Sequence, residues 1–329
     1  MKRFCAFIFL LFTFYFLLPE KQVWYFGNGA GIKFSGNGVQ PLHDGKIYTN
    51  EGCSSAYDEK GNLLLYSDGM TVWNKNHSAL KNGEGLNGNK STTQSAIIIP
   101  KPTSKNLFYI FTADTLAGAK GMCYSLADVS ANVVISKNIK LVEPVTEKLA
   151  AVSHSNRKDV WIIIHAWNSN NFCSYPVTEK GIGAPVISSV GIIHKETEQR
   201  PDKSGQGRSR ETIGEMKFSH DGKKIAVAIC YRSTNNLDLL DFDNSTGKIS
   251  NPISLSVNGY PYGLCFSPDN TKLYVSFLKG PYGIVQFDLS SGKELTPSPV
   301  TINETPNTFG SLQLAPNGKI YVARNGCCL

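Results

Sequence analysis

The chain has 329 residues, of which 41% are hydrophobic and 18% charged; these globular proportions exclude wholesale disorder and allow one large all-β domain or two smaller ones. The net charge of +7 is spread thinly without a long Lys/Arg block, so no basic face for nucleic acid is predicted. The eight cysteines include no C-x-x-C pair, so the usual zinc spacing is missing.

The N-terminus has the pattern of an export signal. Lys2 and Arg3 precede an apolar run from Phe4 to Leu18, which is the length of a signal-peptide core. A membrane span needs about 20 residues, so this run is short for one. We therefore predict a signal peptide over residues 1–22 and export to the periplasm, the cell surface or the medium. The alternative is an inner-membrane anchor through residues 4–18, the only membrane contact expected.

Beyond the N-terminus, the chain alternates short strands and turns. Residues 23–34 combine an aromatic strand with a Gly/Asn-rich bend, and turn-rich sequence continues to Asn50. Residues 76–90 are a loop by composition. Six units follow the pattern of a β-hairpin, with alternating apolar residues on both sides of a polar turn. These units are residues 54–68, 95–114, 150–167, 214–230, 262–277 and 310–324.

The hairpins recur at the period of a propeller blade. The first apolar residue after each turn is Leu63, Leu107, Val160, Ile225, Leu273 or Ile320, at intervals of 44, 53, 65, 48 and 47 residues. Four-stranded blades repeat every 40–50 residues or so. We predict an all-β protein, a β-propeller of four-stranded antiparallel blades over residues 23–329, with about six repeats and the last incomplete. An incomplete ring predicts an exposed sheet edge and a chain that is a fragment of a longer protein.

One insertion stands apart from the repeats. Residues 196–210 are nearly free of apolar side chains, so they are predicted to form a mobile loop. The alternative interpretation is a basic contact loop through Arg200, Lys203, Arg208 and Arg210.

The sequence contains no catalytic or metal-binding motif. The six histidines show no H-x-H or H-x-x-x-H spacing, G-x-S-x-G is absent, and the Gly-rich stretch at residues 26–34 lacks a phosphate-loop register. Cys173, Cys230 and Cys265 lie in or beside apolar runs and are predicted to be buried free thiols. No catalytic, cofactor-binding or metal-binding residue is assigned, and no cofactor is expected.

Position in the repeat still nominates residues to examine. The strand that begins each repeat lines the axis of a propeller, so Gln94, His154, Glu215 and Tyr262 are the candidates for an enzymatic site there. Trp73 and Trp167 are the candidates for a polysaccharide-binding platform.

Several stretches resemble a known family. VWYFGNGAGIKF (23–34), NEGCSSAYDEKGNLLLYSDGMTVWNKNH (50–77) and YGLCFSPDNTKLYVSF (262–277) are similar to the N-terminal WD-like or YVTN-like propeller of Bacteroidetes gliding-motility-associated surface proteins. Those proteins end in a type B sorting domain for type IX secretion. The resemblance implies an exported, non-catalytic binding or scaffold module in gliding or adhesion, with a protein or polysaccharide partner. The alternatives are a propeller hydrolase or lyase with an axial site, and a polysaccharide-binding adhesin.

Overall fold

The computed structural model describes residues 22–36, 38–196, 210–280, 283–291, 294–300 and 309–324. The predicted signal peptide lies outside these residues except for Gln22, and so does most of the insertion at residues 196–210. Cys5, Cys327 and Cys328 are also outside them. Among the described residues, no helix has the length and apolar character needed to cross a bilayer.

The described strands form seven antiparallel groups. Sheet 1 contains β1 (Gln22–Phe26), β2 (Ala30–Ser35) and β3 (Gly38–Leu42). Sheet 2 contains β4 (Ser54–Tyr57), β5 (Leu63–Ser67), β6 (Thr71–Asn74) and β7 (Ala79–Glu84). Sheet 3 contains β8 (Ala96–Pro100), β9 (Leu107–Ala113), β10 (Met122–Asp128) and β11 (Val133–Val142). A parallel pairing of Lys81 with Val133 joins sheets 2 and 3 at their outer strands.

The second half of the chain continues in the same order. Sheet 4 contains β12 (Val145–Ser153), β13 (Val160–Ala166), β14 (Ser169–Thr178), β15 (Gly181–Ile182) and β16 (Val186–His194). Sheet 5 contains β17 (Met216–Phe218), β18 (Lys224–Ala228), β19 (Leu237–Asp243) and β20 (Lys248–Leu255). Sheet 6 contains β21 (Tyr260–Phe266), β22 (Lys272–Lys279), β23 (Ile284–Asp288) and β24 (Ser298–Pro299). Sheet 7 contains β25 (Phe309–Leu314) and β26 (Ile320–Arg324). A short 3₁₀ helix, η1, spans Arg210–Thr212 before β17.

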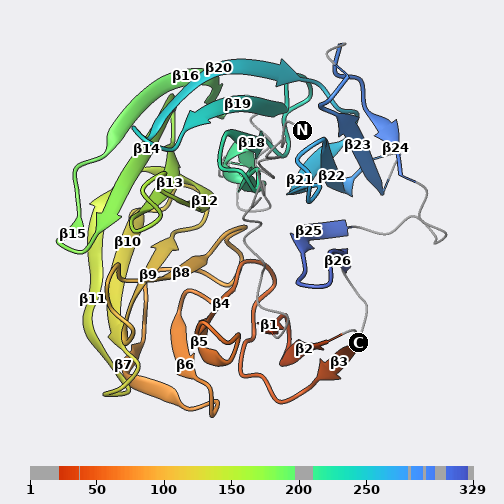
Figure 1. The fold of residues 1–329 in the computed structure, drawn as a ribbon. Coiled ribbons are helices and arrows are strands. Elements are labelled where there is room, and N and C mark those ends of the chain that lie inside the picture. The colour runs from red at the N-terminus through yellow and green to blue at the C-terminus, as the bar shows by residue number, and fades with distance from the viewer. Residues whose placement is uncertain are drawn as a thin grey trace, which may run out of the picture.

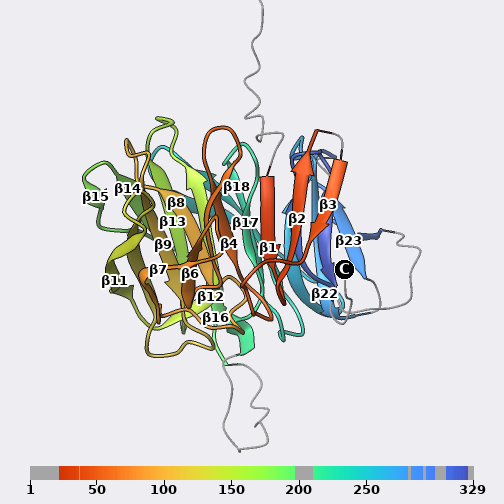
Figure 2. The same cartoon turned by 90° about the horizontal axis from the view of Figure 1, so that it is seen from below.

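The sheets follow one another around a ring, which confirms the predicted propeller (Figure 1). In sheets 3, 4 and 6 the first strand lies toward the centre of the ring and the last strand toward its rim. Seen from the side, most strands run along the ring axis, so each sheet has two ends that face opposite faces of the disc (Figure 2). A residue at the start of an inner strand is therefore far from one at its end.

The structure corrects several strand predictions. Residues 76–90 are not a loop throughout, because β7 lies within them, and β3 lies within the stretch expected to be only turns. No residue of β3 is buried, and β7 buries only Leu80 and Gly83, so neither strand shows apolar alternation. The strand number also varies: sheet 4 has five strands, sheet 1 has three and sheet 7 has two.

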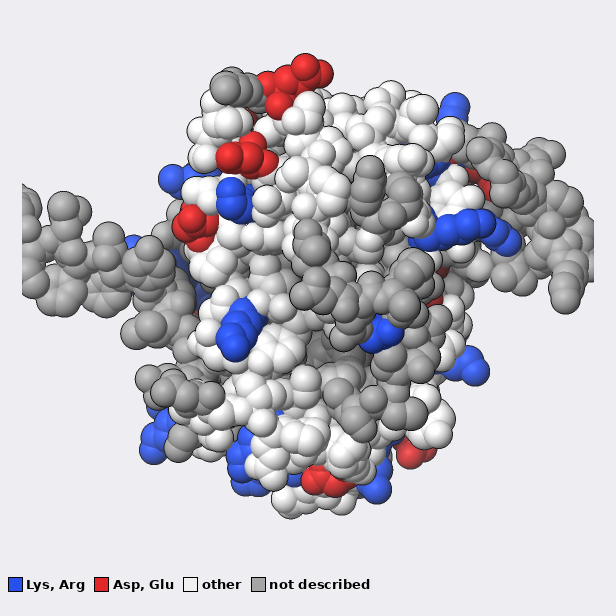
Figure 3. All heavy atoms as spheres, turned by 90° about the vertical axis from the view of Figure 1, so that its right-hand side faces the viewer, with Lys and Arg blue, Asp and Glu red and all other residues white. Residues whose placement is uncertain are grey.

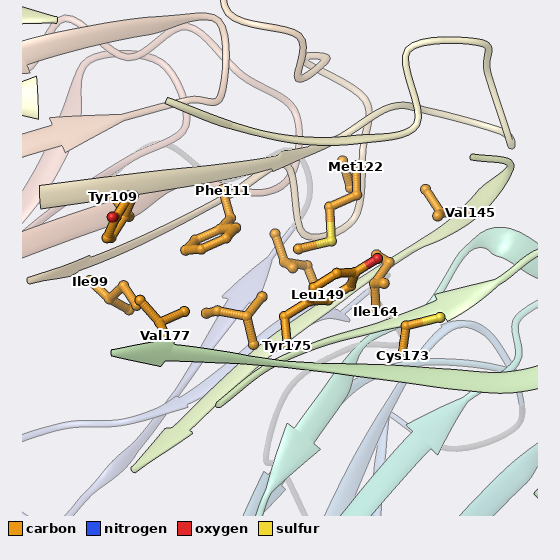
Figure 4. Packing of buried hydrophobic residues seen from close by; sticks show 12 residues of the cluster. Ile99, Tyr109, Phe111, Met122, Val145, Leu149, Ile164, Cys173, Tyr175 and Val177 are labelled. Carbon is orange, nitrogen blue, oxygen red and sulfur yellow. The ribbon is translucent and has the colours of Figure 1, made fainter. Parts of the chain in front are cut away.

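Neighbouring sheets pack face to face through apolar side chains. Between sheets 3 and 4, Phe111 and Met122 lie against Leu149, Ile164 and Tyr175, all of them buried (Figure 4). Burying such side chains contributes roughly 1.5–3 kcal/mol each. The predicted free thiols belong to this kind of packing, because Cys173, Cys230 and Cys265 are all buried and unbridged.

Sheet 1 occupies the position where the repeat pattern predicted an open edge. Figure 1 shows it between sheet 2 and sheet 7. Tyr321 of β26 packs edge-on against Phe34 of β2, with ring centroids 5.4 Å apart, and against Trp24 of β1 at 6.0 Å. On the other side, Tyr25 of β1 packs on Tyr66 of β5 at 4.8 Å. Aromatic contacts thus join the first and last described sheets.

Charges are mixed on the outer wall of the ring. On the side turned toward the viewer in Figure 3, Lys and Arg are interspersed with Asp and Glu. This face carries no broad patch of one sign.

Candidate functional site

Polar side chains meet across the ring axis. The Tyr262 hydroxyl donates to Glu51 Oε2 at 2.9 Å, linking sheet 6 to the segment before sheet 2. Gln94 Nε2 donates to the backbone oxygen of Met216 at 3.1 Å, which links the segment before sheet 3 to sheet 5. We refer to Glu51, Thr93, Glu147, Glu215 and Tyr262 as the axial cluster.

Some of these polar groups join neighbouring inner strands. Glu215 Oε2 accepts the backbone N–H of Leu264 at 2.9 Å, and Gln94 Oε1 accepts that of Leu149 at 3.1 Å. Each bond connects the beginning of one sheet to the next sheet around the ring. Glu215 is 3% exposed, so an unpaired carboxylate there would carry a large desolvation cost. These hydrogen bonds show that Glu215 and Gln94 hold neighbouring sheets together.

Glu147, at the start of β12, is also committed to the protein. Its Oε2 accepts the backbone N–H of Thr93 at 2.9 Å and the Thr93 hydroxyl at 2.8 Å. Its Oε1 accepts the Thr115 hydroxyl and the Leu116 N–H, both at 3.0 Å. The side chain is 1% exposed. With four donors around its two oxygens, this carboxylate anchors the loop after β9 and has little capacity left for a ligand.

Glu51 is different, because it is the half-buried carboxyl group of the cluster. It accepts the Ser91 hydroxyl at 3.2 Å on Oε1 and the Tyr262 hydroxyl on Oε2. Burial, followed by the nearby Glu147 carboxylate, raises the pKa of Glu51 to about 7, against the opposing hydrogen bonds from Tyr262, Ser91 and Thr93. Burial, then Glu51 and Glu215, holds the pKa of Tyr262 well above its usual value, so this hydroxyl remains a donor.

Replacing Glu51 by Gln is expected to change the pH dependence of folding. The carboxyl has a pKa near 4.5 when unfolded and a raised one when folded, so its ionisation removes stability as the pH rises from 4.5 through 7. After discounting for partial exposure, Glu51→Gln should gain about 1–2 kcal/mol relative to wild type between pH 5 and pH 8. Urea unfolding at the two pH values measures this difference. Parallel pH profiles of the two proteins would contradict it.

A buried lysine lies beside the cluster. Lys148 is fully buried, and its ammonium donates to the backbone oxygens of Glu211 at 3.1 Å, Thr212 at 2.7 Å and Ile213 at 3.0 Å. Burial lowers the pKa of Lys148 to about 7, and the charge of Glu147 opposes this shift. Three carbonyl acceptors match the three N–H donors of an ammonium group. Lys148 therefore fixes the turn that leads from η1 into β17.

Arg210, in η1 before this turn, lies beside an aromatic pair formed by Tyr231 and Tyr260. Their ring centroids are 4.6 Å apart with a tilt of 32°. The Arg210 guanidinium lies 5.0 Å from the centroid of the Tyr231 ring. Both tyrosines are half-buried, and Tyr231 has a left-handed φ of 63°, an uncommon backbone conformation for an aromatic residue.

Three of the four residues nominated from the repeats belong to this region, and one does not. Gln94, Glu215 and Tyr262 converge at the axis, as expected. His154 lies in the turn after β12, stacked on Trp161 with ring centroids 5.5 Å apart, so its nomination was wrong. The strand begins at Val145 rather than at Ala150, which places His154 at the far end of the sheet.

The two tryptophans proposed as a sugar platform are used in packing. Trp167 is 8% exposed, and Trp73 stacks on Tyr66 with ring centroids 5.4 Å apart. Sequence reasoning missed Glu51, Glu147 and Lys148. The signal that could have found them is a polar residue within a few positions of the start of each inner strand, where an apolar pattern is otherwise expected.

Comparison with known protein families and with curated proteins finds no match. Among solved structures, the periplasmic gluconolactonase PpgL of Pseudomonas aeruginosa is similar with a TM-score of 0.50 at 12% identity, covering 82% of this chain and 76% of that one. A chain of the mitotic checkpoint complex has a TM-score of 0.50 at 13% identity, covering 90% and 78%. At these identities the likeness concerns the fold, and the chain is an all-β propeller.

Proposed function

We propose that this protein is an exported β-propeller that binds a polar ligand at its axial cluster without transforming it. The observation that carries this proposal is the Glu51 carboxyl. It is half-buried at the ring axis and is held by the Ser91 and Tyr262 hydroxyls, and among the described residues it bonds to no backbone group of a neighbouring inner strand. A half-buried polar group with spare acceptor capacity, set among convergent polar side chains, is typical of a ligand site.

Binding accounts for the geometry better than catalysis does. Acid–base hydrolysis requires two groups free to exchange protons with the substrate or with water. Glu147 is saturated by four donors, and Glu215 is buried and bonded to the Leu264 N–H. Glu51 alone retains free acceptor capacity and partial exposure within the axial cluster.

Export and the kind of partner belong to the same proposal. They are supported by the signal-like segment at residues 1–22 and by the resemblance to surface propellers of gliding bacteria. In this proposal the protein acts in the cell envelope or outside it, as a binding module for a protein or polysaccharide in gliding or adhesion.

A ligand-observed NMR screen with a library of small polar compounds tests the binding site. We expect a subset of hits whose saturation-transfer signal is lost, or weakened at least tenfold, in Glu51→Leu. Glu59→Leu, at an exposed position in the turn between β4 and β5, is the matched control and should retain the hits. Near-ultraviolet circular dichroism checks that both variants fold. If every hit binds Glu51→Leu as tightly as wild type, the axial site is not where ligands bind.

An enzymatic role is the second candidate, and one observation favours it. The pKa of Glu51 is raised to about 7, which suits a general acid at neutral pH, and an ordered tyrosine hydroxyl contacts it. Turnover of nitrophenyl glycosides or esters by wild type, abolished by Glu51→Gln and unaffected by Glu59→Gln, would replace the binding proposal with a hydrolase.

A further inference from the structure

We infer that the ligand is a neutral carbohydrate, an inference that rests on the proposed binding site. One sugar ring lies on the face of Tyr260, and one sugar hydroxyl donates a hydrogen bond to Glu51. Nothing in the sequence pattern singles out Tyr260. The inference comes from the contacts around the aromatic pair and from the charges that surround it.

The aromatic pair lies close to the Glu51 carboxyl. Tyr260 precedes Tyr262 by two residues on β21, and the Tyr262 hydroxyl contacts Glu51 directly. Two residues of chain span at most about 7 Å, and β21 is irregular between Tyr260 and Pro261, so the two Cα atoms lie no farther apart than roughly the width of one sugar ring and its substituents. Tyr231 is near enough for the Glu51 charge to contribute to raising its pKa, after burial and Cys230. A ligand of a few rings could therefore touch the pair and the carboxyl together.

Within the pair, Tyr260 has the more available ring. The Arg210 guanidinium and Tyr260 both lie against the ring of Tyr231, so other groups of the protein already contact the Tyr231 ring. Tyr260 is half-buried, and Tyr231 is its one aromatic neighbour within the described part of the chain. An aromatic face of this kind packs well against the C–H face of a pyranose, which buries apolar area while the sugar hydroxyls remain at the edge.

Charge selects against ionic ligands of either sign. The carboxylate of Glu147 lies near Glu51 and that of Glu215 near Tyr262, and both repel an anion. The Arg210 guanidinium already occupies the cation position on the aromatic pair, so it repels a second cation there. The carboxyl oxygens and hydroxyls of the site remain available as hydrogen-bond partners, and they bind an uncharged ligand that donates hydrogen bonds. A polyhydroxylated ring satisfies both parts of the site.

The test compares tetrasaccharides that differ in charge. Cellotetraose and chitotetraose are neutral, the tetramer of chitosan is cationic, and tetragalacturonate is anionic. Isothermal titration calorimetry should show that at least one neutral tetrasaccharide binds at least tenfold more tightly than both charged ones. Its C–H protons should shift upfield in NMR spectra, because ring current from Tyr260 acts on a stacked sugar.

Matched variants separate stacking from general damage. Tyr260→Ala should weaken binding at least tenfold and remove the upfield shifts, whereas Tyr260→Phe keeps the ring and should stay within about twofold of wild type. Ile139→Ala removes an exposed apolar side chain from β11 at the rim and should bind normally. The inference is overturned if a charged tetrasaccharide binds best, if none binds at 10 mM, or if Tyr260→Ala binds like wild type. Any of these results leaves the proposed site intact, provided that the fragment hits still depend on Glu51.

Discussion

Lys148→Met is expected to destabilise the folded protein by about 3 kcal/mol at pH 8.5. The substitution keeps the length and much of the volume of the side chain. It removes the N–H donors of three backbone carbonyls. Each buried polar group left unsatisfied costs roughly 1–3 kcal/mol.

The titration of Lys148 acts in the opposite direction and determines the pH at which the experiment is done. The pKa of Lys148 is lowered on folding, so the folded chain holds this side chain neutral where the unfolded chain has it charged. This stability penalty grows as the pH falls from about 10.5 toward 7. Removing the lysine relieves that penalty. At pH 8.5 the relief is about 3 kcal/mol, which is smaller than the summed cost of three orphaned carbonyls.

Lys224→Met provides the control for this experiment. Lys224 also has an acceptor at short distance, Asp241 Oδ1 at 2.6 Å, but both side chains of this ion pair are about 40% exposed (43% and 39%). Exposed ion pairs contribute about 0–1 kcal/mol, so this variant should unfold within about 1 kcal/mol of wild type in urea. Equal losses in Lys148→Met and Lys224→Met would show that the three carbonyl contacts do not stabilise the turn.

Acidification below pH 6.5 is expected to destabilise the protein through two stacked histidines. His165 on β13 and His194 on β16 have ring centroids 3.8 Å apart, tilted by 19°, and are 0% and 1% exposed. Both ring nitrogens of His165 and Nδ1 of His194 are buried without a hydrogen-bond partner among the described residues. Burial, then Lys148, lowers the pKa of His165 to about 3, and burial, then His165, lowers that of His194 well below 6.5.

The sign follows from proton binding. Below pH 6.5 the unfolded chain binds a proton at each histidine while the folded chain does not, so stability falls as the pH falls. Each ring contributes about 1.4 kcal/mol per pH unit, and the two together about 2.7 kcal/mol. Glu51 acts oppositely over pH 7 to 4.5, because its folded-state pKa is raised. The difference between wild type and a variant without the two rings isolates the histidine contribution.

The variant His165→Phe/His194→Phe keeps two stacked aromatic rings and removes both titrations. Its free energy of unfolding is measured in urea from pH 7.5 to 5.0. Below pH 6.5 we expect the variant to lose about 2–3 kcal/mol less stability per pH unit than wild type. His43→Gln, at an exposed position, should leave the wild-type pH profile unchanged. Coincident profiles of the double variant and wild type would show that the buried rings do not titrate on unfolding.

The repeat architecture was predictable because it depends on short-range pattern. Alternating apolar residues around polar turns gave the hairpins of sheets 2 to 7, including the pair Tyr260–Phe266 and Lys272–Lys279. The buried thiols followed from the same alternation. The strands β3 and β7 escaped prediction, because a strand with at most one buried apolar side chain shows no apolar alternation.

The candidate site was predictable only in part. Tyr262 and Glu215 were nominated from their position in a repeat, whereas Glu51, Lys148 and the His165–His194 pair carry no local signature. The Tyr262–Glu51 bond joins residues 211 positions apart, and the Lys148 contacts span 63 to 65 positions. Sequence alone determined which segments become strands and where they turn, since those preferences act within a few residues. Only the closing of the ring decided which polar side chains meet at its axis, because that depends on the positions of whole sheets.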